Sequence, residues 1–477
     1  MAVGSSNSFD LVVLGAGTGG YAAAFRAAQL GMRVALVDSY KIGGTCLHIG
    51  CIPTKAMLET ADLYAKVRKA GDYGLRVGPT SVDMTALAKR RDGVVERLHK
   101  GLQGLVKKHK VEYIRGTGRL NGHTKVEIEL LDEDFRPAGS RSLDATDVIL
   151  ATGSRVKSLP GLVPDGRRVV TSDDILKGDG LPQSLIVVGA GAVGVEFASF
   201  YADMGAQVTV LEYLPSLVPL EDREVGTELE RSFKRRGIET MTNARFDPAA
   251  VEVTGDGVCL MVGPEGGEAR ELRAEQLLVA TGRAANVEGV GLETTRAKVE
   301  KGVVQVDLRT MRTAEPHLYA IGDVVGGLWL AHVAAHEGLA AVAAIANMEP
   351  EPVDYQRMPR ATYCRPQIAS IGRSEQECER DGIPYKTGKF PWIANGKALI
   401  GGEYEGFVKV VAQRDTDQVL GVHMIGPHVT DLISEASAAM LLEATAWELG
   451  AAVHPHPTLS EALGEAATLV DGWAINI

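Results

Sequence analysis

The sequence predicts an α/β protein with several domains, and three observations support this fold class. The chain has 477 residues, of which 45% are hydrophobic, enough for a large buried core. Glycine is unusually frequent, with 55 copies, whereas only 5% of the residues are aromatic. A pattern of strand, glycine turn, helix and strand occurs twice along the chain. At about 150 residues per domain, the length corresponds to about three domains.

Residues 11–38 and 185–212 form an internal repeat. Their sequences, LVVLGAGTGGYAAAFRAAQLGMRVALVD and LIVVGAGAVGVEFASFYADMGAQVTVLE, align without a gap. Each begins with an apolar run typical of a parallel strand covered on both faces, and turns through G-x-G-x-x-G into an Ala-rich helix. Each then returns to a second apolar strand that ends in an acid. A lone motif of this kind could be a glycine turn without a ligand, but the complete pattern predicts two Rossmann-like dinucleotide-binding domains.

The glycines and the acid of each repeat have separate roles in holding a dinucleotide. The first glycine allows a tight turn, the second lets backbone N–H groups approach a pyrophosphate, and the third lets helix and strand pack closely. The acid suits hydrogen bonds to ribose hydroxyls. These residues are Gly15, Gly17, Gly20 and Asp38 in the first repeat, and Gly189, Gly191, Gly194 and Glu212 in the second.

The two repeats are expected to bind different dinucleotides. A carboxylate at Glu212 would repel a 2′-phosphate, and no arginine cluster follows it, so we expect NAD at the second site. FAD is the simplest occupant of the first site, because a flavin exchanges a hydride with a nicotinamide.

Two cysteines separated by four residues follow the first repeat, in the string GGTCLHIGCIPTK. In a regular helix Cys46 and Cys51 would lie about 7.5 Å apart along the axis, farther than a disulfide spans. Gly50, and Pro53, which biases Ile52 away from helix, offer the irregularity that a bridge would need. A zinc site or two inert thiols are alternatives, but the sequence has no second cysteine pair for zinc. The pattern favours a redox-active disulfide beside a flavin.

The string GGTCLHIGCIPTKA closely resembles the active-site segment of the flavoprotein disulfide reductases. HIGCIPTK is the form typical of the family members that oxidise dihydrolipoamide. The likeness spans essentially the whole chain and includes LATGS at 150–154, ATGR at 280–283, TAEPHLYAIGD at 313–323 and HPHPTLSE at 454–461. The resemblance implies FAD and NAD as cofactors, and an enzyme that oxidises dihydrolipoamide to lipoamide while it reduces NAD+.

The resemblance also assigns the redox roles. Cys46 is the interchange thiol that exchanges with the substrate disulfide, and Cys51 faces the flavin. Lys55 matches the family lysine near the reactive nitrogen of the flavin, and Glu196 matches its ion-pair partner beside the nicotinamide. A solvated surface pair is the alternative for these two residues, although Ala22 occupies the position of Glu196 in the first repeat.

Acid–base chemistry is assigned to the HPHPTLSE segment. His456 resembles the base that takes a proton from the dithiol, and Glu461 resembles the carboxylate that orients it. His454, next to it, is expected to be structural. His332 and His336, four residues apart, could resemble a metal pair, but they lack the H-E-x-x-H order and a third ligand, so no metal site is predicted.

The remaining cofactor contacts are also implied by the resemblance. Besides its glycine turn, the FAD site is expected to use Gly44, Thr45, Lys55, Gly118, Thr152, Gly153, Ser154, Asp323, Leu330, Ala331 and His332. Besides its own turn, the NAD site is expected to use Glu196, Glu212 and Gly282.

The expected architecture nests one nucleotide domain within another. Residues 1–150 and 281–350 form the FAD domain, 151–280 the NAD domain, and 351–477 an α+β dimerisation domain with strand-like FVKVVAQ and VLGVHMI. In the family the base reaches the cysteines of the other subunit, which implies a homodimer. The implied partners are the lipoyl domain and the subunit-binding domain of a 2-oxo acid dehydrogenase core protein.

Composition excludes several classes of function. The net charge of −11 opposes binding to nucleic acid. Five unevenly spaced cysteines and a polar leader without a signal-peptide pattern indicate the cytoplasm. The most apolar stretch, 330–346, is interrupted by charged residues and glycine, so it does not predict a membrane span. Three alternatives remain: a glutathione-type reductase that uses NADPH, an NADH oxidase or transhydrogenase, and a noncatalytic nucleotide-binding protein.

Overall fold

The computed structural model describes residues 7–477, and the chain divides into two compact units. Each unit is assembled from segments that are far apart in the sequence. The first unit contains the chain up to Ala56, Ala88–Val156 and Arg283–Tyr355, and the second contains Met57–Leu87, Lys157–Gly282 and Gln356–Ile477. Within the described residues, no helix is both long and apolar enough to cross a membrane.

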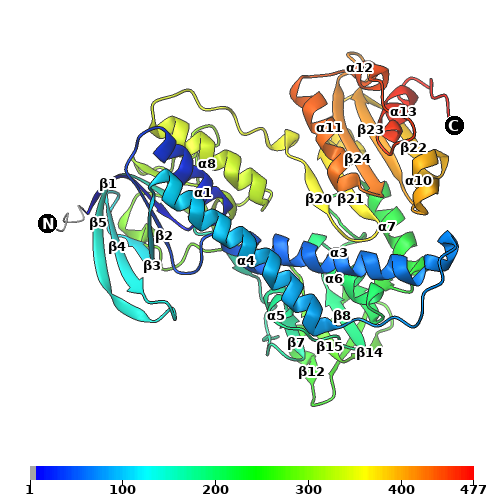
Figure 1. Cartoon of the computed structure of the whole chain (residues 1–477), viewed down its shortest axis with the longest axis horizontal. Helices are drawn as coiled ribbons and strands as arrows, with labels where there is room; N and C mark the ends of the chain where they lie inside the picture. The colour runs from blue at the N-terminus through cyan, green and yellow to red at the C-terminus, as the bar shows by residue number, and fades with distance from the viewer. Residues whose placement is uncertain (1–6) are drawn as a thin grey trace. The chain divides into compact units, whose positions relative to one another are not determined.

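The first unit is built on a parallel sheet in which β1 lies between β2 and β5 (Figure 1). Strand β3 extends the sheet beyond β2, and β19 extends it beyond β5, while β4 pairs antiparallel with the far ends of β3 and β5. The strands are β1 Ser8–Leu14, β2 Val34–Asp38, β3 Glu112–Leu120, β4 Lys125–Leu131, β5 Pro137–Leu150 and β19 Leu318–Ala320.

Both faces of this sheet are buried, which explains the unbroken apolar runs of its strands. Leu11 and Val13 pack in one core with the helices α1 (Thr18–Gln29), α4 (Met84–His109) and α8 (Ala331–Ile345). Val12 and Leu14 face the opposite way, into a core shared with the ribbon formed by β3, β4 and β5. Alternate residues of one strand therefore supply two different cores.

Helices α1 and α8 lie side by side because glycine faces the crossing (Figure 1). A Cβ atom at Gly19 would lie 2.8 Å from the backbone oxygen of Ala334, and one at Gly338 would lie 2.8 Å from the oxygen of Gly19. Any side chain at these positions would push the helices apart.

The second unit repeats the order of the first sheet. Strand β8 lies between β9 and β15, with β10 beyond β9 and β7 beyond β15, and all of these pairs are parallel. The helix α6 (Ala192–Asp203) follows β8 as α1 follows β1. The repeat expected from the sequence is therefore confirmed as two parallel sheets with one strand order. The strands are β7 Val169–Thr171, β8 Ser184–Val188, β9 Gln207–Leu211, β10 Glu239–Met241 and β15 Gln276–Val279.

The C-terminal part of the second unit is an antiparallel sheet in the order β20, β21, β24, β23, β22. The helices α11 (Val429–Leu441) and α13 (Glu461–Leu469) share its core. The strands expected from FVKVVAQ and VLGVHMI are β23 and β24. The predicted α/β fold class with a C-terminal α+β part is confirmed. The strands are β20 Arg360–Thr362, β21 Gln367–Gly372, β22 Tyr385–Pro391, β23 Phe407–Gln413 and β24 Val419–Gly426.

The remaining elements are shorter or connect these sheets. The helices are α2 Gly44–Ile49, α3 Cys51–Arg68, α5 Ser172–Lys177, α7 Arg223–Arg235, α9 Glu375–Asp381, α10 Gly396–Gly401 and α12 Ala446–Ala451. The strands are β6 Ser154–Val156, β11 Ala244–Arg245, β12 Glu252–Val253, β13 Val258–Pro264, β14 Arg270–Ala274, β16 Arg283–Ala285, β17 Val299–Glu300 and β18 Val303–Val304.

Candidate active site

The first glycine turn is held from both sides of its middle residue, Ala16. The backbone N–H of Ala16 donates to a carboxylate oxygen of Asp38 at 2.5 Å, and the backbone oxygen of Ala16 accepts from the N–H of Gly43 at 2.8 Å. Burial raises the pKa of Asp38, and the N–H groups of Ala16 and Tyr40 oppose that rise. The acid expected to reach a ribose thus also fixes the turn.

The second glycine turn is held in the same way. The N–H of Ala190 donates to Glu212 at 2.7 Å, and its oxygen accepts from the N–H of Val218 at 2.9 Å. The other carboxylate oxygen of Glu212 accepts from the N–H of Leu214 at 2.8 Å. The two repeats therefore share the hydrogen bonds that hold their glycine turns as well as their sequence pattern.

The geometry of both turns fits a dinucleotide pyrophosphate. A Cβ atom at Gly17 or Gly191 would meet nothing within 4 Å, whereas one at Gly20 or Gly194 would lie less than 2 Å from the backbone oxygen of the first glycine in its turn. Each turn therefore has open space beside its middle glycine, whereas close packing requires a glycine at its third position. Within residues 7–477, no side chain caps the N-terminus of α1 or α6, so their first N–H groups can meet an anion.

The cysteine pair lies where one helix ends and the next begins. Helix α2 ends at Ile49, Gly50 leaves helical geometry with φ −149° and ψ −117°, and α3 starts at Cys51. The irregularity expected at Gly50 is confirmed. The expectation that Ile52 avoids helix is wrong, because Pro53 falls in the first turn of α3, where its missing N–H has no helical partner to lose.

The thiols of Cys46 and Cys51 interact directly. A hydrogen bond between them and burial raise the pKa of Cys46, while the positive charge of Lys55 opposes the rise. The two cysteines do not form a disulfide in this structure, and Cys51 is exposed. Close packing joins this segment to the first turn, because a Cβ atom at Gly44 would lie 2.6 Å from Cα of Gly17. A dithiol pair therefore lies beside the first glycine turn.

A hydrogen-bonded group in the first unit joins two of the segments expected at the FAD site. Ser154 donates to the carboxylate of Asp323, and Arg283 donates from Nε to the hydroxyl of Ser154 at 2.6 Å. The hydroxyl of Thr152 donates to the backbone oxygen of Asn286 at 2.8 Å, and the Asn286 amide donates back to the oxygen of Thr152. These contacts bring residues 152–154 together with Asp323, and the binding of FAD by these residues stays a prediction.

The two histidines of the HPHP segment have different surroundings. His456 is exposed, and its Nδ1 lies 2.8 Å from Oε1 of Glu461. Burial opposes ionisation of Glu461, but the N–H of Thr458 and the ring of His456 outweigh it and lower the pKa of Glu461. His454 is largely buried against Glu435, with Nε2 2.7 Å from the carboxylate. One histidine thus presents a free edge to solvent, and the other is part of the packing.

Comparisons with known proteins identify the family. The model of the pyridine nucleotide-disulphide oxidoreductases matches residues 9–338, and the model of their dimerisation domain matches residues 358–467. The chain belongs to the pyridine nucleotide-disulphide oxidoreductase family. The resemblance found in the sequence is thereby confirmed.

Individual relatives of this family match over nearly their full length. The chain is 47% identical to the dihydrolipoyl dehydrogenase of Bacillus subtilis, over 99% of this chain and 100% of that protein. It is 40% identical to the dihydrolipoyl dehydrogenase of Zymomonas mobilis, with 99% and 100% coverage. The solved structure of LpdA from Mycobacterium tuberculosis is similar with a TM-score of 0.87 at 29% identity, covering 96% of this chain and 98% of that one.

Other family residues predicted from the sequence have distinct local surroundings. Leu330, Ala331 and His332 form the N-terminus of α8. A Cβ atom at Gly118 would lie 2.6 Å from the end of the Leu14 side chain, which would have to move to make room for it. Glu196 is buried and accepts from the N–H of Tyr363 at 2.8 Å. Lys55 and Glu196 belong to different units, and so do the cysteines and His456, so both pairings stay predictions.

The structure adds two polar residues that sequence reasoning missed. The hydroxyl of Thr281 is buried and, among the described residues, has no hydrogen-bond partner, directly before Gly282 of the expected NAD site. Glu337 is buried in α8 and accepts from the N–H of Gly322 at 2.6 Å and from the hydroxyl of Tyr355 at 2.8 Å. The sequence shows Glu337 only as an acid that interrupts the apolar stretch 330–346, without a role. Among the described residues, no cluster of His, Cys, Asp and Glu could hold a metal ion.

Proposed function

We propose that this chain is a dihydrolipoyl dehydrogenase, which works as a homodimer with FAD and reduces NAD+. The observation that carries the proposal is the contact between the thiols of Cys46 and Cys51 beside the first glycine turn. The full-length identity to dihydrolipoyl dehydrogenases supports the substrate, and the match to a dimerisation domain supports the dimer. A cytoplasmic location and docking on a 2-oxo acid dehydrogenase core stay predictions from the sequence.

The protein's own residues carry the thiol chemistry. In the oxidised enzyme Cys46 and Cys51 form a disulfide. One thiolate of dihydrolipoamide attacks Cys46, the disulfide bond breaks, and Cys51 leaves as a thiolate. The second thiol of the substrate loses its proton to His456 and displaces Cys46, which releases lipoamide and leaves a reduced cysteine pair. Two electrons thus pass from the substrate to the protein.

Glu461 prepares His456 for this proton transfer. Its carboxylate fixes the tautomer with the proton on Nδ1, so Nε2 is left as the acceptor that faces outward. The N–H of Thr458 holds the other carboxylate oxygen at 2.7 Å, which prevents rotation of the pair. The exposure of His456 suits a base that acts on a substrate bound by the partner subunit.

The first unit supplies the groups that would hold FAD. The open turn at Gly17 and the N-terminus of α1 suit the pyrophosphate, Asp38 suits a ribose, and Asp323 suits the ribityl chain. When bound at these residues, FAD would supply the two-electron redox chemistry that links the cysteine pair to NAD+. Lys55 would hold a positive charge beside this cofactor, and Gly191 with α6 would hold the NAD pyrophosphate.

The test is the steady-state oxidation of dihydrolipoamide by purified enzyme with either NAD+ or NADP+. We expect the wild type to use NAD+ and to prefer it strongly, because the Glu212 carboxylate disfavours a 2′-phosphate. Cys46→Ser and Cys51→Ser should each lose activity by at least about 1000-fold, since neither can form the disulfide. Cys259→Ser is the matched control and should keep wild-type activity. Full activity in either variant of the pair, or preference for NADP+, would refute the proposal.

A further inference from the structure

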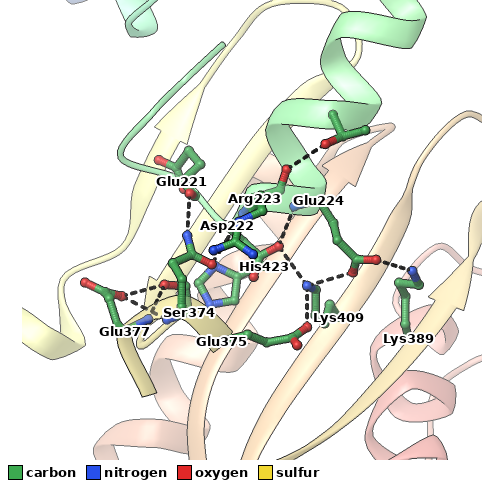
Figure 2. A network of polar contacts seen from close by, with 12 residues as sticks. Glu221, Asp222, Arg223, Glu224, Ser374, Glu375, Glu377, Lys389, Lys409 and His423 are labelled. Carbon is green, nitrogen blue, oxygen red and sulfur yellow. Dashed lines mark hydrogen bonds and ion pairs between the residues drawn. The ribbon is translucent and has the colours of Figure 1, made fainter. Parts of the chain in front are cut away.

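The C-terminal sheet carries a row of polar residues across its strands, and Figure 2 shows three of them, Lys389, Lys409 and His423. Register pairs Arg360 with Ser370, Ser370 with His423, His423 with Lys409, and Lys409 with Lys389. Residues directly opposite each other in a sheet share a face, so these five side chains form one line, defined here as the basic row. Lys409 is only 1% exposed, and His423 is fully buried. A buried lysine at this place requires a strong compensating interaction.

Three carboxylates from the turn before α7 and its first residues meet the basic row. Lys409 contacts Asp222 at 2.7 Å and Glu224 at 2.8 Å, and Lys389 contacts the other oxygen of Glu224 at 2.8 Å (Figure 2). Glu221 accepts hydrogen bonds from both Arg360 and Ser370. Each of the three cations, Arg360, Lys409 and Lys389, therefore contacts a carboxylate.

Lys409 is the centre of this cluster. It also contacts Glu375 at 2.6 Å, at the N-terminus of α9. Burial alone would lower the pKa of Lys409, but its three carboxylate partners outweigh burial and raise it. Asp222, which is 1% exposed, caps α7 through the N–H of Glu224 at 3.0 Å. The ammonium group of Lys409 thus fixes the point at which α7 begins.

The segment that ends at Asp222 begins at the second glycine turn. Glu212 holds the N–H of Ala190, and Val218 donates to the oxygen of Ala190. Val218 has a φ of +42°, which a β-branched residue adopts only when its surroundings impose it. The N–H of Glu221 in turn donates to the oxygen of Val218 at 2.8 Å. The basic row is therefore linked to the peptide of Ala190 through Asp222, Glu221 and Val218.

The first repeat uses a different segment for the same contact. There the N–H of Gly43 donates to the oxygen of Ala16, directly before the cysteine segment. The second repeat has no cysteines, and the strained Val218 takes the place of Gly43. A left-handed conformation costs glycine little, whereas Val218 requires outside support. The contacts of Arg360 and Ser370 with Glu221, and of Lys409 with Asp222, supply this support.

From these contacts we infer that Lys409 is a positioning residue for the second dinucleotide. By anchoring Asp222, it holds Val218 in its strained conformation, and Val218 keeps the Ala190 peptide oriented for a pyrophosphate. The inference rests on the proposed use of NAD at this turn. It assigns part of the nucleotide affinity to a residue of the C-terminal sheet, which contains none of the predicted nucleotide contacts.

The first test compares Lys409→Met with wild-type holoenzyme. We expect KM for NAD+ to rise by about tenfold, equivalent to about 1.4 kcal/mol, with kcat at saturating NAD+ within about twofold. The Kd of ADP-ribose, an unreactive probe measured by calorimetry with the FAD site filled, should rise by a similar factor. Anaerobic reduction of the flavin by dihydrolipoamide should keep its wild-type rate. A merely structural role for Lys409 would not separate these two half-reactions.

Amide hydrogen exchange gives a readout that does not depend on the nucleotide. The N–H of Ala190 should exchange faster in Lys409→Met, while the N–H of Ala16 should be unchanged. Lys389→Met is the matched control, because this exposed lysine touches Glu224 but not Asp222. It should leave KM, Kd and exchange at wild-type values.

Loss of the buried cation could prevent folding, because it leaves Asp222 unpaired. Asp222→Asn/Lys409→Met removes both charges and keeps a residue that caps helices well. This double variant should fold and show the same rise in Kd for ADP-ribose. Wild-type Kd and wild-type exchange at Ala190 in a folded variant would overturn the inference. If the wild type fails to use NAD+ while exchange at Ala190 responds to Lys409, the proposed function fails and the structural coupling stands.

Discussion

Nδ1 of His456 lies 2.8 Å from Oε1 of Glu461, and the N–H of Thr458 holds the other oxygen of that carboxylate. The pair leaves a single nitrogen of the imidazole free to accept a proton. Beside it, His454 has the opposite arrangement, with its Nε2 bound to Glu435. Two histidines two residues apart are thus distinguished by the carboxylates that they meet.

Replacing the carboxylate partner of each histidine should show that only His456 acts in catalysis. Glu461→Gln removes the charge that stabilises a protonated His456, so kcat for dihydrolipoamide oxidation should fall by about 10- to 100-fold. Glu435→Gln at His454 is the control and should lower thermal stability without lowering kcat. Equal effects of the two variants on kcat would contradict the role of His456.

The glycine turns allow a prediction that distinguishes ligand contact from packing. Gly17→Ala adds a methyl group to open space at φ −67°, so the protein should fold but retain little FAD. Gly20→Ala would place Cβ 1.8 Å from the oxygen of Gly15, so it should prevent folding of the first unit. Expression yield, circular dichroism and flavin absorbance measure the two effects. Gly17→Ala with normal FAD content would show that the pyrophosphate does not approach this turn.

The same comparison applies to the second turn. Gly191→Ala meets nothing within 4 Å, so the enzyme should fold and remain yellow. Reduction of the flavin by dihydrolipoamide should be normal, while KM for NAD+ should rise by at least about tenfold. An unchanged KM would place the nicotinamide nucleotide elsewhere.

Glu337 should make stability depend on pH. Burial raises the pKa of Glu337 to about 7 from its ordinary value of 4.5, although the N–H of Gly322 and the hydroxyl of Tyr355 oppose the rise. The native state therefore binds this proton more tightly than the unfolded state does, so stability from this group is complete below pH 4.5 and falls as pH rises to 7. Its loss is on the order of 3 kcal/mol.

Glu337→Gln provides the comparison, because its side chain does not titrate. Between pH 5 and pH 8 the melting temperature of the wild type should fall more than that of Glu337→Gln, measured for both as holoenzyme. Melting temperatures that change in parallel over this range would contradict a buried, protonated Glu337.

Much of the fold could be predicted because its signals are local. The apolar runs and the glycine turn of each repeat lie within 28 consecutive residues. The structure has β1, α1 and β2 in the first repeat and β8, α6 and β9 in the second. The break in the helix at Gly50 could also be predicted from the residue type. The helical conformation of Ile52 could not, since the effect of Pro53 on the preceding residue depends on where α3 begins, and proline is well tolerated in a first turn.

The basic row could not be predicted from the sequence. Its members come from five strands, and no local sequence pattern predicts the register between antiparallel strands that are distant in the chain. Lys409 in FVKVVAQ looks like a solvent-facing residue of an ordinary strand, yet its side chain is buried. The strained φ of Val218 is similarly a product of tertiary contacts. The sequence therefore did not indicate the roles of Lys409 and Val218, which depend on tertiary contacts. The residues expected to touch cofactors, in contrast, belong to recognisable sequence motifs.

An anaerobic spectral titration tests the central claim most directly. Purified wild-type enzyme should be yellow, its flavin absorbance should change on addition of dihydrolipoamide, and the oxidised spectrum should return on addition of NAD+. Cys51→Ser should bind FAD but show no such change, because the electrons have no path through the cysteine pair. A wild-type spectrum that dihydrolipoamide leaves unchanged, or a Cys51→Ser enzyme that responds like the wild type, would contradict electron transfer through Cys46 and Cys51.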